Sequence, residues 1–223
     1  MSHQMTATTP IAERKEDRQR SRSRWLQITG LLLLSALPVL GGVLRLREVS
    51  ADPASALPLA SAAPIGVHIV AMSVFCCLGA FQFSPALRNR RSWHRRAGRV
   101  LIPAGLFAAL SAAWLAVVFS GPTEELASAM VRLVFAVAMA GVLVQAVIAI
   151  KRRDFAAHAA WMTRAYAIAV SGGTQALVFT LWTLTFGEVD ASGETWLVAA
   201  GFVINSFVAE LLIRRRTAGP MNG

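Results

Sequence analysis

The stretch LASAMVRLVFAVAMAGVLVQAVIAI, residues 126–150, holds one charged side chain, Arg132, in 25 positions. As a helix it would be about 37 Å long, which exceeds the roughly 30 Å hydrocarbon core of a bilayer, so it predicts a transmembrane helix. Its apolar residues do not alternate with polar ones as those of a barrel strand do. Five more runs of this kind lie along the chain. The six predicted spans are 25–44, 64–83, 99–119, 126–150, 155–186 and 196–213.

The whole chain is as apolar as this stretch suggests. Of its 223 residues, 55% are hydrophobic and 15% are charged, and the mean hydropathy is +0.53. In a soluble domain about a quarter of the residues are charged, so the composition argues strongly against a soluble fold. We therefore expect an all-α fold, a polytopic membrane helix bundle of about six transmembrane helices.

The basic residues are distributed unevenly between the two sides of this bundle. Eighteen of the 22 Lys and Arg residues lie in the N-terminal tail, in the second and fourth connections and after the last span, whereas the alternate loops hold only Arg45 and Arg47. Because short loops rich in Lys and Arg are retained in the cytoplasm, both termini are predicted to be cytoplasmic, in the inner (plasma) membrane of a bacterial cell. The net charge of +10 then follows from topology and indicates no nucleic-acid partner.

Three segments are expected along the chain. Residues 1–24 are polar and basic, so we predict a disordered cytoplasmic tail that contacts anionic headgroups. Residues 25–213 form the transmembrane domain, in which Pro64 is expected in the first turn of the second span, and residues 214–223 form a basic cytoplasmic tail. The adjacent Cys76 and Cys77 indicate apolar packing and no disulfide framework.

Several spaced motifs mark the middle of the chain. In order they are His68, Phe81-Gln82-Phe83 with Arg88, His94-Arg95-x-x-Gly98-Arg99, and His158-x-x-Trp161-Met162-x-Arg164. This pattern resembles an uncharacterised bacterial membrane-protein family known as domain of unknown function 2306, over about residues 64–185. The resemblance implies a multi-helix membrane protein, and no activity comes with it.

Polar side chains inside apolar spans are costly unless they are paired, so they are the candidate functional residues. Near the predicted cytoplasmic face they are Gln82, His94, Arg99, Gln145, His158, Arg164 and Glu210, and near the outer face they are His68, Arg132 and Gln175. In the fifth span one helical sector, expected to face the bundle interior, contains Trp161, Arg164, Ser171 and Gln175. Glu210 and Arg214, four residues apart, predict a local ion pair. For Arg132 two alternatives stay open, snorkelling to the outer surface and a buried pairing.

His94 and His158 are candidate axial ligands of a b-type haem, because neutral imidazole is the usual axial ligand of such a haem. Both begin helices that enter from the cytoplasm, so their depths match. His68 is separated from that level by about 22 Å of helix and cannot share an iron with them. The haem propionates would be steadied by Arg95, Arg99 or Arg164. Alternatively, the two histidines cap helices, bind lipid phosphate or make polar contacts within the bundle.

Three functions stay open on these residues. The first is a haem-bearing membrane redox subunit, which needs a redox partner because the chain carries no soluble cofactor motif. The second is a small transporter or proton-linked permease, acting as a homodimer, whose path is lined by Arg164, Ser171, Gln175, Arg132 and His68. The third is a non-catalytic membrane scaffold that contacts anionic lipid through its Arg-rich cytoplasmic loop. The first predicts colour, the second flux without colour, and the third neither.

Overall fold

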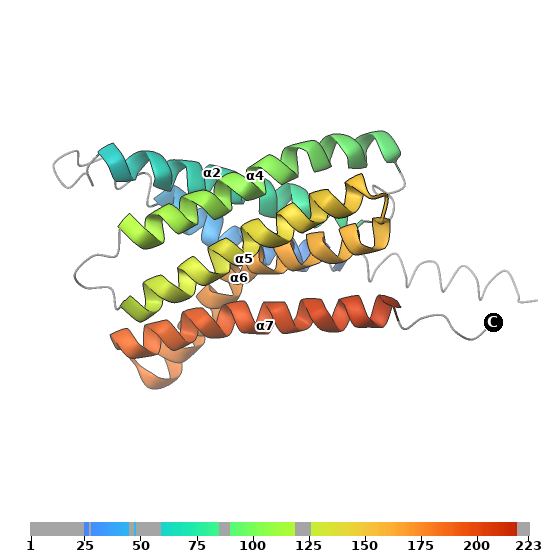
Figure 1. Cartoon of the computed structure of the whole chain (residues 1–223). Helices are drawn as coiled ribbons and strands as arrows, with labels where there is room; N and C mark the ends of the chain where they lie inside the picture. The colour runs from blue at the N-terminus through green and yellow to red at the C-terminus, as the bar shows by residue number, and fades with distance from the viewer. Residues whose placement is uncertain are drawn as a thin grey trace, which may run out of the picture.

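The computed structural model of the chain describes residues 25–26, 28–44, 47, 59–84, 90–118 and 126–217. Within these residues every regular element is a helix. A helix over Ile28–Leu44 comes first. It is followed by α2 (Leu59–Gln82), α4 (Arg91–Val118), α5 (Leu126–Lys151), α6 (Phe155–Phe186) and α7 (Ala191–Thr217). The helices run roughly along one common direction (Figure 1).

Five of the described helices are long and apolar enough to cross a membrane. They are α2 from Ala63 onward, α4, α5, α6 and α7, whereas the apolar helix Ile28–Leu44 is shorter. This finding confirms the predicted all-α, polytopic membrane bundle. The predicted tail 1–24 and the final residues 218–223 lie outside the described residues, and the cytoplasmic location of both termini stays a prediction.

Three helices extend beyond their predicted apolar spans. α4 begins at Arg91 rather than Arg99, so Arg95 lies on the helix and not in a loop. α7 includes Arg214–Arg216, which were expected in the tail. α2 begins before Pro64 and contains that proline, which was expected in its first turn. Hydropathy locates the part of a helix that suits lipid, but Arg and Ala also favour helix, so the helices continue into their polar flanks.

Four helices form a ring in which each helix packs against two neighbours. α2 packs on α4, α4 on α5, α5 on α6, and α6 on α2, so α4 and α6 lie opposite each other. α7 packs along α6 and also contacts α5. The helix Ile28–Leu44 lies against α2 and α6, where Gly42 adjoins Ile69 and Gly173 adjoins Leu34.

The interior of the ring is filled with apolar side chains. Its largest buried members are Phe75, Leu101, Met139, Leu143 and Tyr166. Tyr166, the chain's one tyrosine, donates its hydroxyl proton to the backbone oxygen of Cys76 at 3.0 Å. A Cβ atom on Gly79 would lie 2.6 Å from Cε2 of Tyr166. The missing side chain at Gly79 therefore lets the tyrosine ring pack directly against α2.

Short turns join α5 to α6 and α6 to α7. After α5, Arg153 adopts a φ of 62°, and Asp154 caps α6 by accepting the Ala157 N–H at 2.9 Å. At the far end of α6, Gly187 has a φ of 88°, a conformation that suits a residue without a side chain. Asp190 then accepts the Gly193 N–H at 2.8 Å and so caps α7.

These turns place opposite charges at opposite ends of the bundle. We call the end at which α4 and α6 begin and α5 and α7 end the basic end, on the right in Figure 1. It carries Arg90, Arg95, Arg96, Arg99, Lys151, Arg152, Arg153, Arg214, Arg215 and Arg216. The opposite end, which we call the acidic end, carries Glu188, Asp190 and Glu194.

Candidate functional site

His94 is held against α2 at the basic end of the bundle. It lies on the first turns of α4, and its Nδ1 proton is donated to Oε1 of Gln82 at the end of α2. The amide nitrogen Nε2 of Gln82 is buried without a hydrogen-bond partner. An unsatisfied buried donor costs about 1–3 kcal/mol, which is why such groups are rare. Among the described residues this amide is one of the few buried polar groups that lack a partner.

His158 is held in the same way, but by a different neighbour. It lies on the first turns of α6, and its Nδ1 donates to the backbone oxygen of Ala146 on α5 at 2.9 Å. A carbonyl oxygen can only accept a hydrogen bond, so in a neutral imidazole Nδ1 carries the proton and Nε2 carries the lone pair. The same reasoning applies to His94 and the Gln82 oxygen.

The two histidines therefore occupy the same end of the ring on opposed helices, as their predicted depths require. Each ring is hydrogen-bonded to a different helix, His94 to α2 and His158 to α5, and not to the other histidine. Deeper in the ring, Leu101 and Tyr166 belong to the buried apolar core. Arg95 and Arg99 are exposed on α4 near His94.

His68 lies toward the acidic end, away from the level of the other two histidines. Its Nδ1 donates to the backbone oxygen of Ala108 at 3.0 Å and lies 3.3 Å from the Ser111 hydroxyl, both on α4. The predicted separation in depth is consistent with this placement. His68 thus joins α2 to α4 near their acidic ends.

A second group of polar side chains lies between α6 and α7. At the basic end, Arg164 donates to both carboxylate oxygens of Glu210, at 2.5 and 3.0 Å. The guanidinium of Arg164 also stacks over Trp161, 4.5 Å from the ring centre. Arg164 is therefore bound to α7 and not directed at the two histidines.

Further along the same interface the polar contacts continue toward the acidic end. The Asn205 amide contacts the Thr174 hydroxyl at 2.9 Å and the Ser171 hydroxyl at 3.3 Å. Gln175 donates to the backbone oxygen of Val198 at 3.1 Å. We call the α6–α7 contacts, from Arg164–Glu210 to Gln175–Val198, the polar seam.

Arg132 on α5 forms an ion pair with α7 near the acidic end. Its Nη2 lies 2.9 Å from Oε1 of Glu194 on the first turn of α7. Arg132 is therefore paired, but the pair is partly exposed, with 34% and 41% of the two side chains accessible, so the observed state lies between the two alternatives. The chain thus ties α7 to the bundle by one ion pair near each end, Arg132–Glu194 and Arg164–Glu210.

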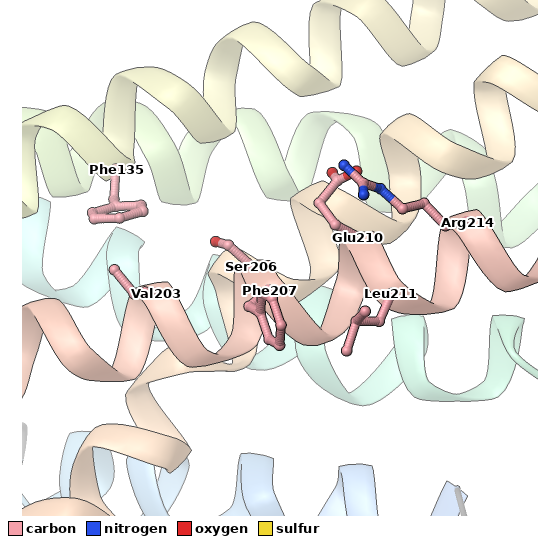
Figure 2. A pocket seen from close by; sticks show the side chains of 7 residues that line it. All are labelled: Phe135, Val203, Ser206, Phe207, Glu210, Leu211 and Arg214. Atoms are coloured by element: carbon pink, nitrogen blue, oxygen red, sulfur yellow. The ribbon is translucent and has the colours of Figure 1, made fainter.

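The sequence reasoning missed Asn205 and the cross-helix partner of Glu210. Asn205 is a polar residue inside the predicted span 196–213, which was a sufficient signal to include it. Glu210 was assigned to Arg214 on its own helix. Arg214 does point back toward Glu210 (Figure 2), but the ion pair of Glu210 with Arg164 joins two helices, and helix spacing alone carries no information on such a pair.

An open groove of about 380 Å³ runs along α7 on the side of α5. Phe135, Val203, Ser206, Phe207, Glu210, Leu211 and Arg214 line it (Figure 2). Its walls are apolar over most of the length, and its charged residues lie at the basic end. Within the described part of the chain, no three His, Cys, Asp or Glu side chains are grouped so as to hold a metal ion.

Comparison with models of known protein families gives a match that covers most of the chain. The model of the family described as "predicted membrane protein (DUF2306)" matches residues 65–213, more than half of the chain. The chain belongs to this family. The match confirms the resemblance seen in the motifs and extends past residue 185, so α7 and the polar seam are part of the family's domain. No curated protein and no solved structure matches this family member.

Proposed function

We propose that this membrane protein is a redox subunit that binds a b-type haem between His94 and His158. One observation carries the proposal. The two residues lie at the same end of the ring, on the opposed helices α4 and α6, and each donates its Nδ1 proton to a carbonyl oxygen. Such a bond leaves the lone pair on Nε2 and orients the ring, which is how metal-ligating imidazoles are usually held.

The surroundings of His94 fit a bound anionic group. Gln82 Nε2 is a buried donor without an acceptor, and a propionate oxygen is an acceptor that would satisfy it. The exposed Arg95 and Arg99 at the same end of the bundle would supply positive charge for a second propionate. Arg164, the third arginine predicted for this role, is already bound by Glu210.

The buried apolar core next to the histidines limits where such a group would lie. Leu101 and Tyr166 follow His94 and His158 by seven and eight residues, or about 10–12 Å of helix. A group bound by both rings would lie between this core and the basic end. A haem needs only two ligands from the protein, since the porphyrin supplies four nitrogens, so the absence of a larger ligand cluster among the described residues is compatible with it.

The absorption spectrum of the purified protein, expressed with haem supply ensured, tests this proposal. The expected result is an intense Soret band and, after reduction with dithionite, the sharp visible bands of a six-coordinate low-spin iron. His94→Ala and His158→Ala should each remove or strongly perturb these bands. His68→Ala is the matched control and should leave them intact. A colourless protein, or a spectrum that depends on His68, would overturn the proposal.

A second candidate function, proton-linked transport, is supported by the polar seam. Arg164, Ser171 and Gln175, all predicted to line a path, do lie along one helix interface, and Asn205 of α7 joins them. His68, the predicted end of that path, bonds to α4 instead. From Arg164 to Gln175 the seam covers about 16 Å of helix, roughly half of the hydrocarbon core. Polar residues inside membrane spans are typical of proton and substrate pathways.

Flux through reconstituted liposomes tests the transport proposal independently of colour. A pH-sensitive dye trapped in the liposomes should report proton movement above that of empty liposomes. Asn205→Leu interrupts the seam and should abolish the flux, whereas Thr180→Val, which changes an exposed threonine of α6 outside the seam, should not. Flux equal to that of empty liposomes, or unaffected by Asn205→Leu, would exclude the seam as a path.

A further inference from the structure

The groove on α7 has the dimensions of a site for one lipid chain. It extends from Val203 to Arg214, eleven residues or about 16 Å of helix. One leaflet of a bilayer's hydrocarbon core is about 15 Å deep. The groove therefore covers the depth of one leaflet and begins near the middle of the span.

The walls of the groove fit a flexible apolar chain better than another helix. Phe135, Val203, Phe207 and Leu211 are large side chains, and Val203 and Phe207 are 58% and 63% exposed on the outer side of α7. Helices that pack on one another in a membrane use small residues at the contact, because these allow close approach. The groove has only one small residue among its lining, Ser206.

The charged end of the groove fits an anionic headgroup. Arg214 at this end of the groove is the first of three consecutive arginines in the last turn of α7. The exposed Arg215 and Arg216 follow directly on α7. Basic residues next to a span attract anionic headgroups, by about 1 kcal/mol for each Lys or Arg.

From this geometry we infer a specific site for one anionic phospholipid, with an acyl chain in the groove and its phosphate at Arg214. The inference does not depend on haem binding, and the site shares one residue, Glu210, with the polar seam. The inference is distinct from a general attraction of lipid to the Arg-rich loop, because it assigns the acyl chain to named residues of α5 and α7. Phosphatidylglycerol is the simplest lipid with the required charge, and phosphatidylcholine with the same acyl chains is the zwitterionic comparison.

Native mass spectrometry of the detergent-solubilised full-length protein tests this site. Equal amounts of phosphatidylglycerol and phosphatidylcholine are added, and the expected result is one retained phosphatidylglycerol molecule per chain. Ser206→Trp fills the groove and should remove this adduct. Val208→Trp places the same ring on an exposed position of α7 outside the lining and should keep it. Val203→Trp provides a second groove-filling variant if Ser206→Trp fails to fold.

The charge of the headgroup is tested with two neighbouring arginines. Arg214→Gln should reduce the preference for phosphatidylglycerol about fivefold. Arg215→Gln, which removes the same charge outside the groove lining, should reduce it less. Equal binding of the two lipids, an adduct unaffected by filling the groove, or a protein that is dimeric through this face with no bound lipid would each overturn the inference.

Discussion

Arg164 on α6 and Glu210 on α7 form a two-point ion pair, with Nε to Oε1 at 2.5 Å and Nη2 to Oε2 at 3.0 Å. This side-by-side geometry matches the planar guanidinium to both carboxylate oxygens and is stronger than a single contact. Because the two residues are 46 positions apart and lie on different helices, the pair fixes how α7 lies on the ring. The stacking of Arg164 on Trp161 restricts the guanidinium further.

Removal of this ion pair is expected to destabilise the bundle. Arg164→Leu leaves the Glu210 carboxylate without its cross-helix partner, and hydrogen bonds to charged groups are worth about 1.5–3 kcal/mol. The melting temperature in detergent should fall clearly. Arg90→Leu is the control, since Arg90 is exposed before α4 begins. Equal melting temperatures for the two variants would show that the pair contributes nothing to the packing of α7.

The sequence was sufficient for the fold class but not for the partners of individual side chains. Apolar runs longer than a bilayer is thick predicted α5 and α6 with the observed ends, apart from one residue at the end of α5. The partner of Glu210 depends on the rotation of α7 about its axis, which packing of the whole ring sets. A single sequence contains the period of each helix but not this rotation. For the same reason the bonds of His94 to α2 and of His158 to α5 could not be predicted.

Two adjacent glycines of α6 are expected to differ sharply in their tolerance of a methyl group. A Cβ on Gly173 would collide with the backbone oxygen of Leu34, whereas one on Gly172 would lie 3.5 Å from Cβ of Pro38, an ordinary contact. Gly173→Ala should therefore lower the free energy of unfolding by about 1–3 kcal/mol, because backbone must move apart. Gly172→Ala should be neutral or slightly stabilising, since alanine favours helix. Thermal unfolding of the two variants in the same detergent checks this, and a reversed order would contradict the packing of Ile28–Leu44 on α6.

Asn205 is expected to contribute to the packing of α7 through its hydrogen bonds. Asn205→Leu removes the contacts with Ser171 and Thr174, and hydrogen bonds between transmembrane helices are worth about 0.6–2 kcal/mol. The variant should be less stable than wild type by an amount in this range. Ile204→Leu, a change on an exposed face of the same helix, should have no effect. If both variants melt like wild type, the hydrogen bonds of Asn205 do not stabilise the α6–α7 interface.

The separation of the basic and acidic ends predicts the orientation of the bundle in the membrane. Reporter fusions at Asp52, Glu124 and Asp190 should behave as periplasmic, and fusions at Arg91, Lys151 and the C-terminus as cytoplasmic, because Lys and Arg are retained inside. Asp190 and Lys151 lie at opposite ends of α6. An inverted pattern at these two positions would place the basic end outside and exclude the cytoplasmic termini.

Gln82 should control haem retention without being a ligand, if His94 binds the iron. Its Oε1 accepts the hydrogen bond from His94 Nδ1, and its buried Nε2 has no hydrogen-bond acceptor. Gln82→Leu therefore removes the group that orients the ring of His94. Loss of such a partner typically lowers metal affinity by about ten- to a hundredfold, and we expect a loss of haem affinity of about this size for Gln82→Leu. Gln145→Leu changes an exposed glutamine near the basic end of α5 and serves as the control. Haem titration followed at the Soret band measures both affinities, and thermal unfolding of the haem-free proteins shows whether stability differs. If Gln82→Leu lowers stability but leaves haem affinity equal to that of Gln145→Leu, then the bond between Gln82 and His94 is structural and the ring of His94 is not oriented for iron.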